Sequence, residues 1–516
     1  MDKPTAGSDG SGLPVGQSLR RLAMWLAVAS RCNAGIVGLR GTLRVCGSRH
    51  VDNPLSGPLR ASGCEFNLPA FGPPDGCASD VSRIGSATYV VITFMRREVV
   101  ITGIGVVCPL GVGRDAVWSA LDQGQSGIDW MPHVRGKDLP FRYAGLVKDF
   151  DPKLYVQPRK TIKVMCHEIQ IAYAAAGLAM EDSGLAAAAA AVDPDRLGVV
   201  LGSEMLYGEL AELTDVYRHC MEGGRFEHDR WGEFAFKDLF PLWMLKYLPN
   251  MAACHISIAH DARAHNNSIV EGGVSSLLAV GEAVSAIERG HADVMLAGGS
   301  GSFAAFSCLP FRGWEHLSKW EGEPVGASRP FEAGRSGSVV GEGAAVLTLE
   351  ERSRAEGRGA KIMARIAGFA SRFESPAAPW QQRTGRAIRQ SIEGALASAQ
   401  MRPAEIGHVN AHGEGTIEQD RLEAQAIREV LGDVPVTAPK SLFGDLAAGS
   451  GAVELVASVL ALEHGRVPRT LNYDQPDPAC PINIVHGESL PLDKRTAVVL
   501  NQAFTGQAAA LVIAAD

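Results

Sequence analysis

The sequence predicts an α/β fold in five layers, α/β/α/β/α, built from two similar halves. Buried-strand patterns alternate with apolar helix patterns along most of the chain, which indicates parallel or mixed sheets covered on both faces. A small-residue turn followed by an apolar helix occurs at residues 272–290 and again at 449–465. The strand and turn at 195–204 compare in layout with those at 405–415. These correspondences predict a duplicated core with one cleft between the halves.

The composition is that of a globular protein with a large core. The chain has 516 residues, of which 46% are hydrophobic and 21% are charged. Its net charge of -8 gives no support for nucleic-acid binding. No apolar run approaches the roughly 20 residues that span a bilayer. The ten cysteines lack CxxC spacing, which predicts neither a zinc site nor a disulfide framework and favours the reduced thiols of a cytoplasmic protein.

Residues 1–94 differ from the rest of the chain. They are rich in Gly, Ser, Pro and Arg and lack sustained helix or strand periodicity. Residues 22–29 resemble the apolar region of a signal peptide, but this run is short and begins late. A globular pattern begins at Met95. We therefore expect a disordered or non-native extension at 1–94, an N-terminal half at 95–352 and a C-terminal half at 353–516.

The first globular half opens with a buried strand. β-Branched residues and glycines over 98–107 predict this strand, which enters a loop at Pro109. The later elements are predicted, in order, as helices at 114–122 and 172–191, a strand at 197–201, a helix at 275–289, and strands at 293–297 and 344–349.

Two segments interrupt this alternation. The aromatic, charged insertion at 205–248 either lines an acyl-binding or partner surface or packs as a lid or dimer flank. The glycine-rich loop at 329–343 has the spacing of neither GxGxxG nor GxxxxGK[ST], which excludes a nucleotide site there.

The turn at Gly272–Gly273 precedes the N-terminus of an apolar helix. Many enzymes place a nucleophile at such a turn, because the helix dipole and the free amides favour developing negative charge. Here the turn carries glycine and no nucleophilic side chain.

From Met95 onward the chain resembles the β-ketoacyl-acyl-carrier-protein synthases, the elongating condensing enzymes of the thiolase fold. The resemblance implies a thiolase-like five-layered core and a homodimer or a heterodimer with a cysteine-bearing ketosynthase. It also implies acyl carrier protein as partner, with phosphopantetheine carried by that partner and no other cofactor. The motifs that carry the resemblance are VVITGIGVVCPLG at 99–111, NMAACHISIA at 250–259, ERGHADVMLAGG at 288–299, RPFEAGRSGSVVGEGAAVLTLEE at 329–351, VNAHGEGT at 409–416 and KSLFGDLAAGSGAVE at 440–454.

In this family a cysteine accepts the acyl chain, and two histidines assist malonyl decarboxylation and stabilise the thioester oxyanion. The resemblance implies catalytic positions for His412, Lys440 and Glu454, which match the first histidine, the lysine and the buried glutamate. It places Asp445 at the second histidine and Gly273 at the cysteine.

The resemblance also implies four substrate-binding positions. Ala503 and Thr505 stand where two phenylalanines gate the acyl pocket in the family, with Phe504 between them. Glu271 lies two residues before the missing cysteine. It can act as a base or replace a bound carboxylate, or it can cap the turn or pair with Lys440 or Arg263.

These departures change the expected chemistry. Gly273 cannot form an acyl-enzyme, and an ionised Asp445 would repel a malonyl carboxylate at short range. Cys254 aligns with a family glycine and is predicted to lie in the core, while Ser275 and Ser276 are typical of N-terminal caps. No metal site is predicted, because the spacing of the nearby candidates fits neither one helix face nor HExxH; these are His255, His260, Asp261 and His265.

Three functions remain open from the sequence. The first is a cysteine-less partner subunit of fatty acid or polyketide biosynthesis, similar to a chain-length factor. The second is an active acyltransferase that condenses or decarboxylates malonyl-carrier protein without an acyl-cysteine, with His412 and Glu271 as candidate groups. The third is a protein that binds acyl chains or acyl carrier protein.

Overall fold

A computed structural model describes residues 97–132, 139, 141–186, 192–204, 208–304, 313–375 and 383–516, together with four short strands nearer the N-terminus. The chain divides into two compact units, Met1–Arg96 and Arg97–Asp516. In the first unit, β1 (Val37–Leu39) pairs with β2 (Thr42–Arg44), and β3 (Asp80–Ile84) pairs with β4 (Ala87–Val91). The rest of 1–94, including residues 22–29, lies outside the described residues, so the expected disordered or non-native extension stays a prediction.

The N-terminal half of the second unit contributes five main strands to the central sheet. The strands β12, β9 and β13 are parallel to one another, and β14 is antiparallel to both β13 and β5. From the outer edge inward their order is β12 (Asn266–Ile269), β9 (Leu197–Gly202), β13 (Val294–Ser302), β14 (Val340–Glu351) and β5 (Val99–Cys108).

The C-terminal half repeats this arrangement. In both halves the strand that comes first in the chain lies innermost and the third lies outside the second. The two innermost strands pair through Ala364 with Ile101 and Arg365 with Val100. From the inside outward the C-terminal order is β15 (Ala364–Phe373), β22 (Gln507–Ala514), β21 (Thr496–Gln502), β16 (His408–Asn410) and β17 (Pro435–Thr437), with β19 (Asn483–Ile484) added at the edge. The predicted duplication is confirmed.

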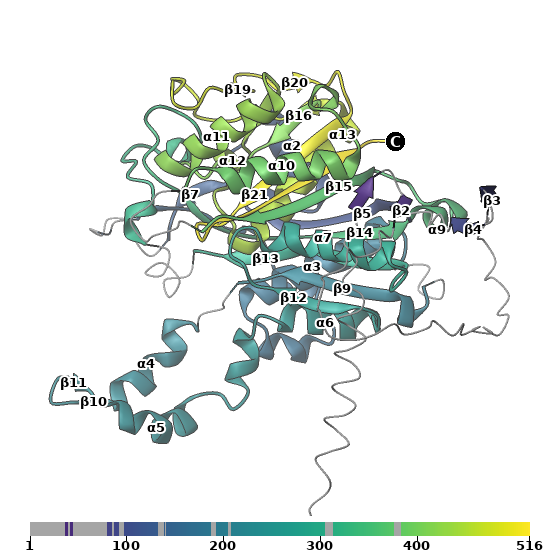
Figure 1. Cartoon of the computed structure of the whole chain (residues 1–516). Coiled ribbons are helices and arrows are strands. Elements are labelled where there is room, and N and C mark those ends of the chain that lie inside the picture. Colours follow the sequence, from purple (N-terminus) through teal and green to yellow (C-terminus); the bar gives the residue numbers. More distant parts are fainter. Residues whose placement is uncertain are drawn as a thin grey trace, which may run out of the picture. The chain divides into compact units, whose positions relative to one another are not determined.

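Helices complete the five layers. Two apolar helices, α7 (Ser275–Glu288) and α13 (Ser450–His464), lie between the strands of the two halves and contact each other. The outer layers lie on opposite sides of the core (Figure 1). They are formed by α3 (His167–Asp182) and α6 (Met251–His260) on the N-terminal half, and by α10 (Arg386–Ala399) and α11 (Ile417–Leu431) on the C-terminal half. The predicted α/β/α/β/α fold is confirmed.

Most predicted elements differ from the structure only at their ends. Both α2 (Arg114–Gln123) and α7 match the predicted helices within one residue. The helix predicted over 172–191 is wrong at both ends, because α3 runs from His167 to Asp182. Gly184 adopts a left-handed conformation with φ 74°, and the Ser183 hydroxyl donates to the carbonyl of Met180 at 2.9 Å. These two residues end the helix despite the alanines that follow; residues 187–191 lie outside the described part.

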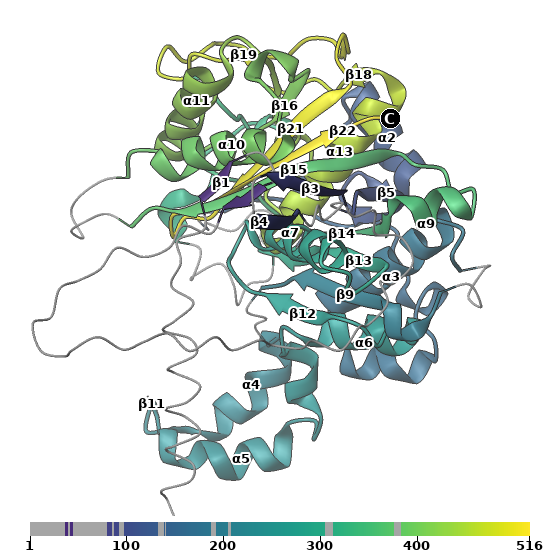
Figure 2. The ribbon, with the colours of Figure 1, turned by 45° about the vertical axis from the view of Figure 1, so that its right-hand side comes forward.

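Residues 208–250, which we call the arm, extend away from the body of the N-terminal half (Figures 1 and 2). The rings of Tyr217, Phe226 and Trp231 lie within 6.4 Å of one another and hold the tip of the arm together. The arm consists of α4 (Leu210–His219), the hairpin of β10 (Met221–Glu222) and β11 (Arg225–Phe226), α5 (Trp231–Asp238) and a 3-10 turn at Trp243–Tyr247. None of the helices in the described part of the chain is long and apolar enough to cross a membrane.

Candidate active site

Four buried polar side chains meet beyond the carboxyl ends of β16, β17 and β21. His412 follows β16, Lys440 begins α12 (Lys440–Phe443) after β17, Asn501 lies at the end of β21, and Glu454 projects from α13. Their exposed fractions are 3% for His412, 1% for Lys440, 1% for Asn501 and 0% for Glu454. Parallel strands bring their carboxyl ends to one edge of a sheet, which is why residues far apart in the sequence converge here.

Lys440 is the centre of this network. Its Nζ donates to the His412 carbonyl at 3.0 Å, lies 3.0 Å from His412 Nδ1 and contacts Glu454 Oε1. An ammonium group has only donors, so Nδ1 must accept, and the neutral ring then carries its proton on Nε2. The network therefore fixes His412 as a hydrogen-bond donor through Nε2.

Glu454 is held from both sides. Its Oε2 accepts a hydrogen bond from Asn501 Nδ2 at 2.6 Å, while Oε1 faces Lys440. Burial raises the pKa of Glu454 to about 8, against the lowering effect of the Lys440 ammonium, and the charge of Asp445 raises it further.

Two buried carboxylates on α11 support the loop that carries His412. Glu423 accepts from the backbone N–H groups of His412 at 2.7 Å and Gly413 at 2.9 Å. Asp420 accepts from Gly415 at 3.0 Å and Phe331 at 2.8 Å. Burial raises the pKa of Glu423 to about 7 and that of Asp420 to about 6. The sequence analysis missed both; the available signal was two acidic residues, three apart, just after the HGEG turn.

The carboxylate of Asp445 accepts hydrogen bonds from nearby residues of the same chain. Its Oδ1 accepts from the Ala447 amide at 3.2 Å and from the Ser450 hydroxyl at 3.0 Å, at the start of α13. Its backbone N–H donates to the Val339 carbonyl at 2.8 Å. Asp445 thus fixes the turn before α13 while its charge still acts on Glu454.

The Gly272–Gly273 turn faces the network from the N-terminal half. A Cβ atom added at Gly273 would lie 3.1 Å from the Gln502 carbonyl oxygen, 3.5 Å from His412 Cε1 and 3.6 Å from Asn501 Oδ1. Gly272 has φ 62°, a conformation that favours glycine. Residue 273 therefore sits beside His412 at the N-terminal end of α7 and contributes no side chain to the site.

The turn between β21 and β22 carries the other candidate substrate-binding residues. Ala503 is buried, and a Cβ at Gly272 would lie 3.6 Å from its methyl group. Phe504 is 61% exposed and Thr505 is also exposed. Arg383 donates to the carbonyls of Ala503 and Phe504 and holds this turn. The structure brings Ala503 to the glycine turn and leaves the side chains of Phe504 and Thr505 in solvent.

Glu271 forms neither of the ion pairs considered from the sequence. Lys440 is paired with Glu454, and Arg263 is paired with Asp261 at 2.8 Å. The Glu271 side chain is exposed, and its backbone N–H donates to Ser275 Oγ at 2.8 Å. Pairing with Lys440 was wrong because that lysine is buried in the C-terminal half, where it contacts His412 and Glu454.

The other candidate residues make contacts that support the fold. Cys254 is half-buried on α6, with Asn250 Nδ2 3.6 Å from its sulfur, so its prediction as a core residue was wrong. Ser276 Oγ accepts from the Ala452 amide at 3.0 Å and ties α7 to α13. His265 Nε2 lies 2.7 Å from Glu282 Oε1. Among the residues that the structure describes, no group of three or more His, Cys, Asp or Glu side chains is arranged to hold a metal.

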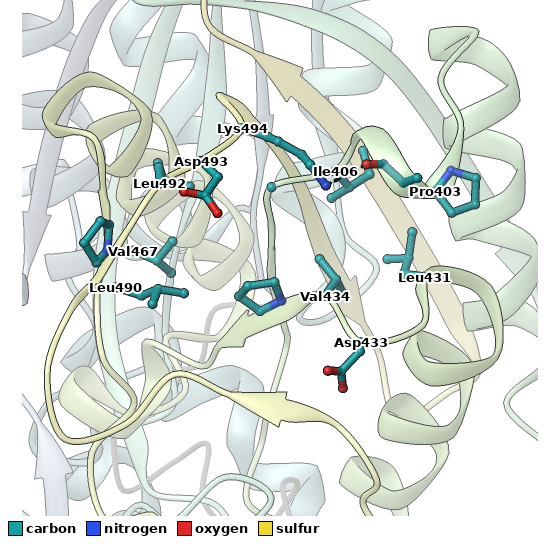
Figure 3. A pocket seen from close by; sticks show the side chains of 14 residues that line it. Pro403, Ile406, Leu431, Asp433, Val434, Val467, Leu490, Leu492, Asp493 and Lys494 are labelled. Carbon is teal, nitrogen blue, oxygen red and sulfur yellow. Dashed lines mark hydrogen bonds between the residues drawn. The ribbon is translucent and has the colours of Figure 1, made fainter.

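A surface pocket of about 500 Å³ lies at the opposite, amino ends of β16, β17 and β21 (Figure 3). Its walls include Ile406, Leu431 and Val434, with Asp433 and Asp493 among its charged residues. The pocket contains none of the four network residues. Because the convergent polar groups lie at the carboxyl ends, we place the candidate active site there and not in this pocket.

Comparison with known proteins identifies the family. The model of the β-ketoacyl synthase N-terminal domain matches residues 96–355, and that of the C-terminal domain matches residues 363–474. The chain belongs to the β-ketoacyl synthase family.

Curated relatives of this chain match it over nearly their whole length. The ketoacyl synthase alpha subunit of the tetracenomycin polyketide synthase of Streptomyces glaucescens is 33% identical over 81% of this chain and 97% of its own. The 3-oxoacyl-[acyl-carrier-protein] synthase 2 of Vibrio harveyi is 33% identical over 81% of this chain and 98% of its own.

Solved structures agree with this synthase fold. A type II PKS acyl-carrier protein in complex with its ketosynthase matches with a TM-score of 0.70 and 29% identity, over 82% of this chain and 100% of that one. The ishigamide ketosynthase/chain length factor matches with a TM-score of 0.71 and 26% identity over the same shares. The thiolase-like core expected from the sequence is thereby confirmed.

Proposed function

We propose that this β-ketoacyl synthase is a cysteine-less partner subunit of fatty acid or polyketide biosynthesis, similar to a chain-length factor. One observation carries the proposal. Gly273 faces His412 from the N-terminal end of α7 without a side chain, while the contacts of Lys440 with His412 and Glu454 are complete. The site thus keeps groups that polarise a thioester and lacks the thiolate that would form an acyl-enzyme.

The arm supports association with a second synthase chain, as a homodimer or as a heterodimer with a cysteine-bearing ketosynthase. Phe236 on α5 is 94% exposed, and a concentration of exposed apolar side chains in one segment is typical of an interaction surface. The outermost strand of the same half, β12, also leaves one edge without a partner strand in the described chain. The other large apolar residues of the arm that are exposed are Leu210, Tyr217, Met221, Phe226, Phe240, Leu242 and Met244.

A basic surface supports acyl carrier protein as the second partner. Lys153, Arg159, Lys160 and Lys163 are exposed around Leu154, and none of the four forms an ion pair with a described acidic residue. Four free cations around an apolar residue complement an acidic protein surface, in a chain whose own net charge is -8. We assign this segment as the docking surface for the carrier protein.

The deciding test is an assay with acyl- and malonyl-carrier protein, with and without cysteine-bearing synthases co-expressed with the chain. We expect co-purification with one of them and condensation only by the pair. Condensation by the isolated chain would contradict the proposal. Gly273→Cys sharpens the test, because the new thiol would stand beside His412. We expect the mass of one acyl group on Gly273→Cys after incubation with acyl-carrier protein, and none on the wild type.

Decarboxylation of malonyl-carrier protein is a second candidate activity. It is favoured by the His412 tautomer, because Nε2–H can donate to the enolate oxygen that forms when carbon dioxide leaves. The measurement is carbon dioxide release, which His412→Ala should abolish and His486→Ala, at an exposed site, should leave unchanged. Absence of release by the wild type, alone and in the pair, would exclude this activity.

A further inference from the structure

The surface pocket at the amino ends of β16, β17 and β21, which we call the amino-end pocket, has the size of a small-molecule site. Its volume of about 500 Å³ lies within the range of about 300–1,000 Å³ that such sites occupy. Most of the side chains that line it are apolar. Val467 and Leu490 lie on one wall and face Leu431 and Val434 on the other (Figure 3). A ligand with an apolar body would therefore remove apolar surface from water when it fills this space.

The walls of the amino-end pocket are held by local structure. Pro403, Pro435 and Pro491 all line it, and the ring of each proline fixes the backbone angle φ. Val467 and Leu490 are opposite residues of two paired strands, β18 (Arg466–Val467) and β20 (Leu490–Pro491). A ligand that enters a preformed pocket loses less free energy to the ordering of the protein.

The amino-end pocket also presents one carboxylate that the chain leaves unpaired. Asp433 is paired with Arg428 at 2.5 Å, and the Lys494 ammonium donates to the Ala404 carbonyl at 2.7 Å. The carboxylate of Asp493 forms neither a hydrogen bond nor an ion pair with any described residue. Its oxygens can accept charge-assisted hydrogen bonds from a cation beside the apolar walls.

We propose that the amino-end pocket binds a small molecule that has an apolar body and one ammonium group. The described residues that line it include no Ser, Thr, Cys, His or Tyr, so we assign binding to this pocket and not catalysis. The inference is independent of the proposed partner role, because β16, β17 and β21 separate the pocket from His412, Lys440 and Asn501 at their carboxyl ends.

The test measures binding of three probes of similar size to the full chain by calorimetry near neutral pH. The probes are phenethylamine, 2-phenylethanol and 3-phenylpropionate, which are cationic, neutral and anionic. We expect the amine to bind about three- to tenfold more tightly than the alcohol, and the carboxylate to bind more weakly than the alcohol. Equal affinities of the amine and the alcohol, tighter binding of the carboxylate, or no binding of any probe would overturn the inference.

Three variants locate the binding site. Asp493→Asn removes the charge and should abolish the preference for the amine while the alcohol still binds. Leu490→Ala removes part of one apolar wall and should weaken the amine and the alcohol alike. Asp229→Asn is the control, because it removes an exposed carboxylate of the arm and should keep the wild-type affinities.

A preference that persists in Asp493→Asn, or is lost in Asp229→Asn, would overturn the assignment to the amino-end pocket. Unchanged affinities in Leu490→Ala would place the probes elsewhere and overturn it as well. Thermal melts confirm that each variant is folded.

Discussion

The connection that follows the second strand differs between the two halves of the core. In the C-terminal half, residues 411–416 join β16 to α11, and this mostly buried turn carries His412. In the N-terminal half, residues 203–250 join β9 to α6, and this connection contains the arm. One strand order therefore supports a compact polar site in one half and an extended apolar surface in the other. Under the proposed function, chemistry and association are divided between the halves.

The two central helices show the same division. The turn before α13 is fixed by Asp445 and Ser450, and the helix carries Glu454 into the network. The turn before α7 presents Gly273 with no side chain. The titratable groups of the network all come from the C-terminal half, and the N-terminal half contributes the backbone of the Gly272–Gly273 turn.

The largest expected effect comes from the network itself. Lys440→Met should lower the free energy of unfolding by about 3–5 kcal/mol, because it leaves the buried Glu454 without its cation. Urea denaturation of the variant and the wild type measures the difference in the free energy of unfolding. The control is Lys361→Met, which removes an ion pair of a lysine that is largely exposed, and should cost at most about 1 kcal/mol. Similar losses in the two variants would contradict a special role for the buried pair.

The next effect concerns the arm. Phe236→Asp should weaken association with the partner synthase about ten- to a hundredfold, because it places a charge in an apolar interface. The stability of the isolated chain should change little, since the ring is already in solvent. Analytical ultracentrifugation measures the association. Phe373→Asp makes the same change at an exposed site at the end of β15, and equal weakening by both variants would refute the assignment to the arm.

A smaller effect depends on pH. The pKa of Glu423 is about 7 in the folded protein against an ordinary value of 4.5, because of burial and the nearby Asp420, partly offset by Lys440 and two backbone hydrogen bonds. Between these values the folded state binds more protons than the unfolded state, so the stability contributed by this group falls as the pH rises. The Gln side chain in Glu423→Gln cannot ionise, so the stability of this variant does not fall with pH for this reason. The stability advantage of the wild type over Glu423→Gln should therefore shrink by about 1–3 kcal/mol from pH 5 to pH 8.

The control for this pH dependence is Glu429→Gln on the same helix, whose side chain is exposed and paired with Arg389. Unfolding curves at several pH values should show a constant difference between this variant and the wild type. A constant difference for Glu423→Gln as well would mean that its carboxyl group is not perturbed by burial.

The smallest expected effect is a difference in stability between substitutions in the turns before α7 and α13. Gly273→Ala should cost about 1 kcal/mol, because its new Cβ would make a tight contact, 3.1 Å from the Gln502 carbonyl oxygen, that a small shift can relieve. Gly449→Ala, in the turn before α13, should cost about 2–3 kcal/mol or more, because its Cβ would lie 2.2 Å from the Gly343 carbonyl oxygen. Thermal melts of the two variants measure the difference, and equal melting temperatures would contradict it.

The sequence predicted the features that local patterns determine. Alternating strands and helices revealed the duplicated core, and short motifs located His412 and Lys440. The partners of these residues depend on contacts between distant segments. Asn501 reaches Glu454 across 47 positions of the chain, and no local pattern indicates this. The exposure of the arm was equally hidden, because aromatic residues in a charged segment are compatible with both a packed lid and an open surface.

The contacts between the two halves have a consequence for folding. The innermost strands β5 and β15 pair through only two pairs of residues, yet each central helix also covers strands of the opposite half. The N-terminal α7 contacts β15 and β22, and the C-terminal α13 contacts β5, β13 and β14. Neither half can bury its own central helix alone, so the duplicated units of this chain should unfold in one cooperative transition.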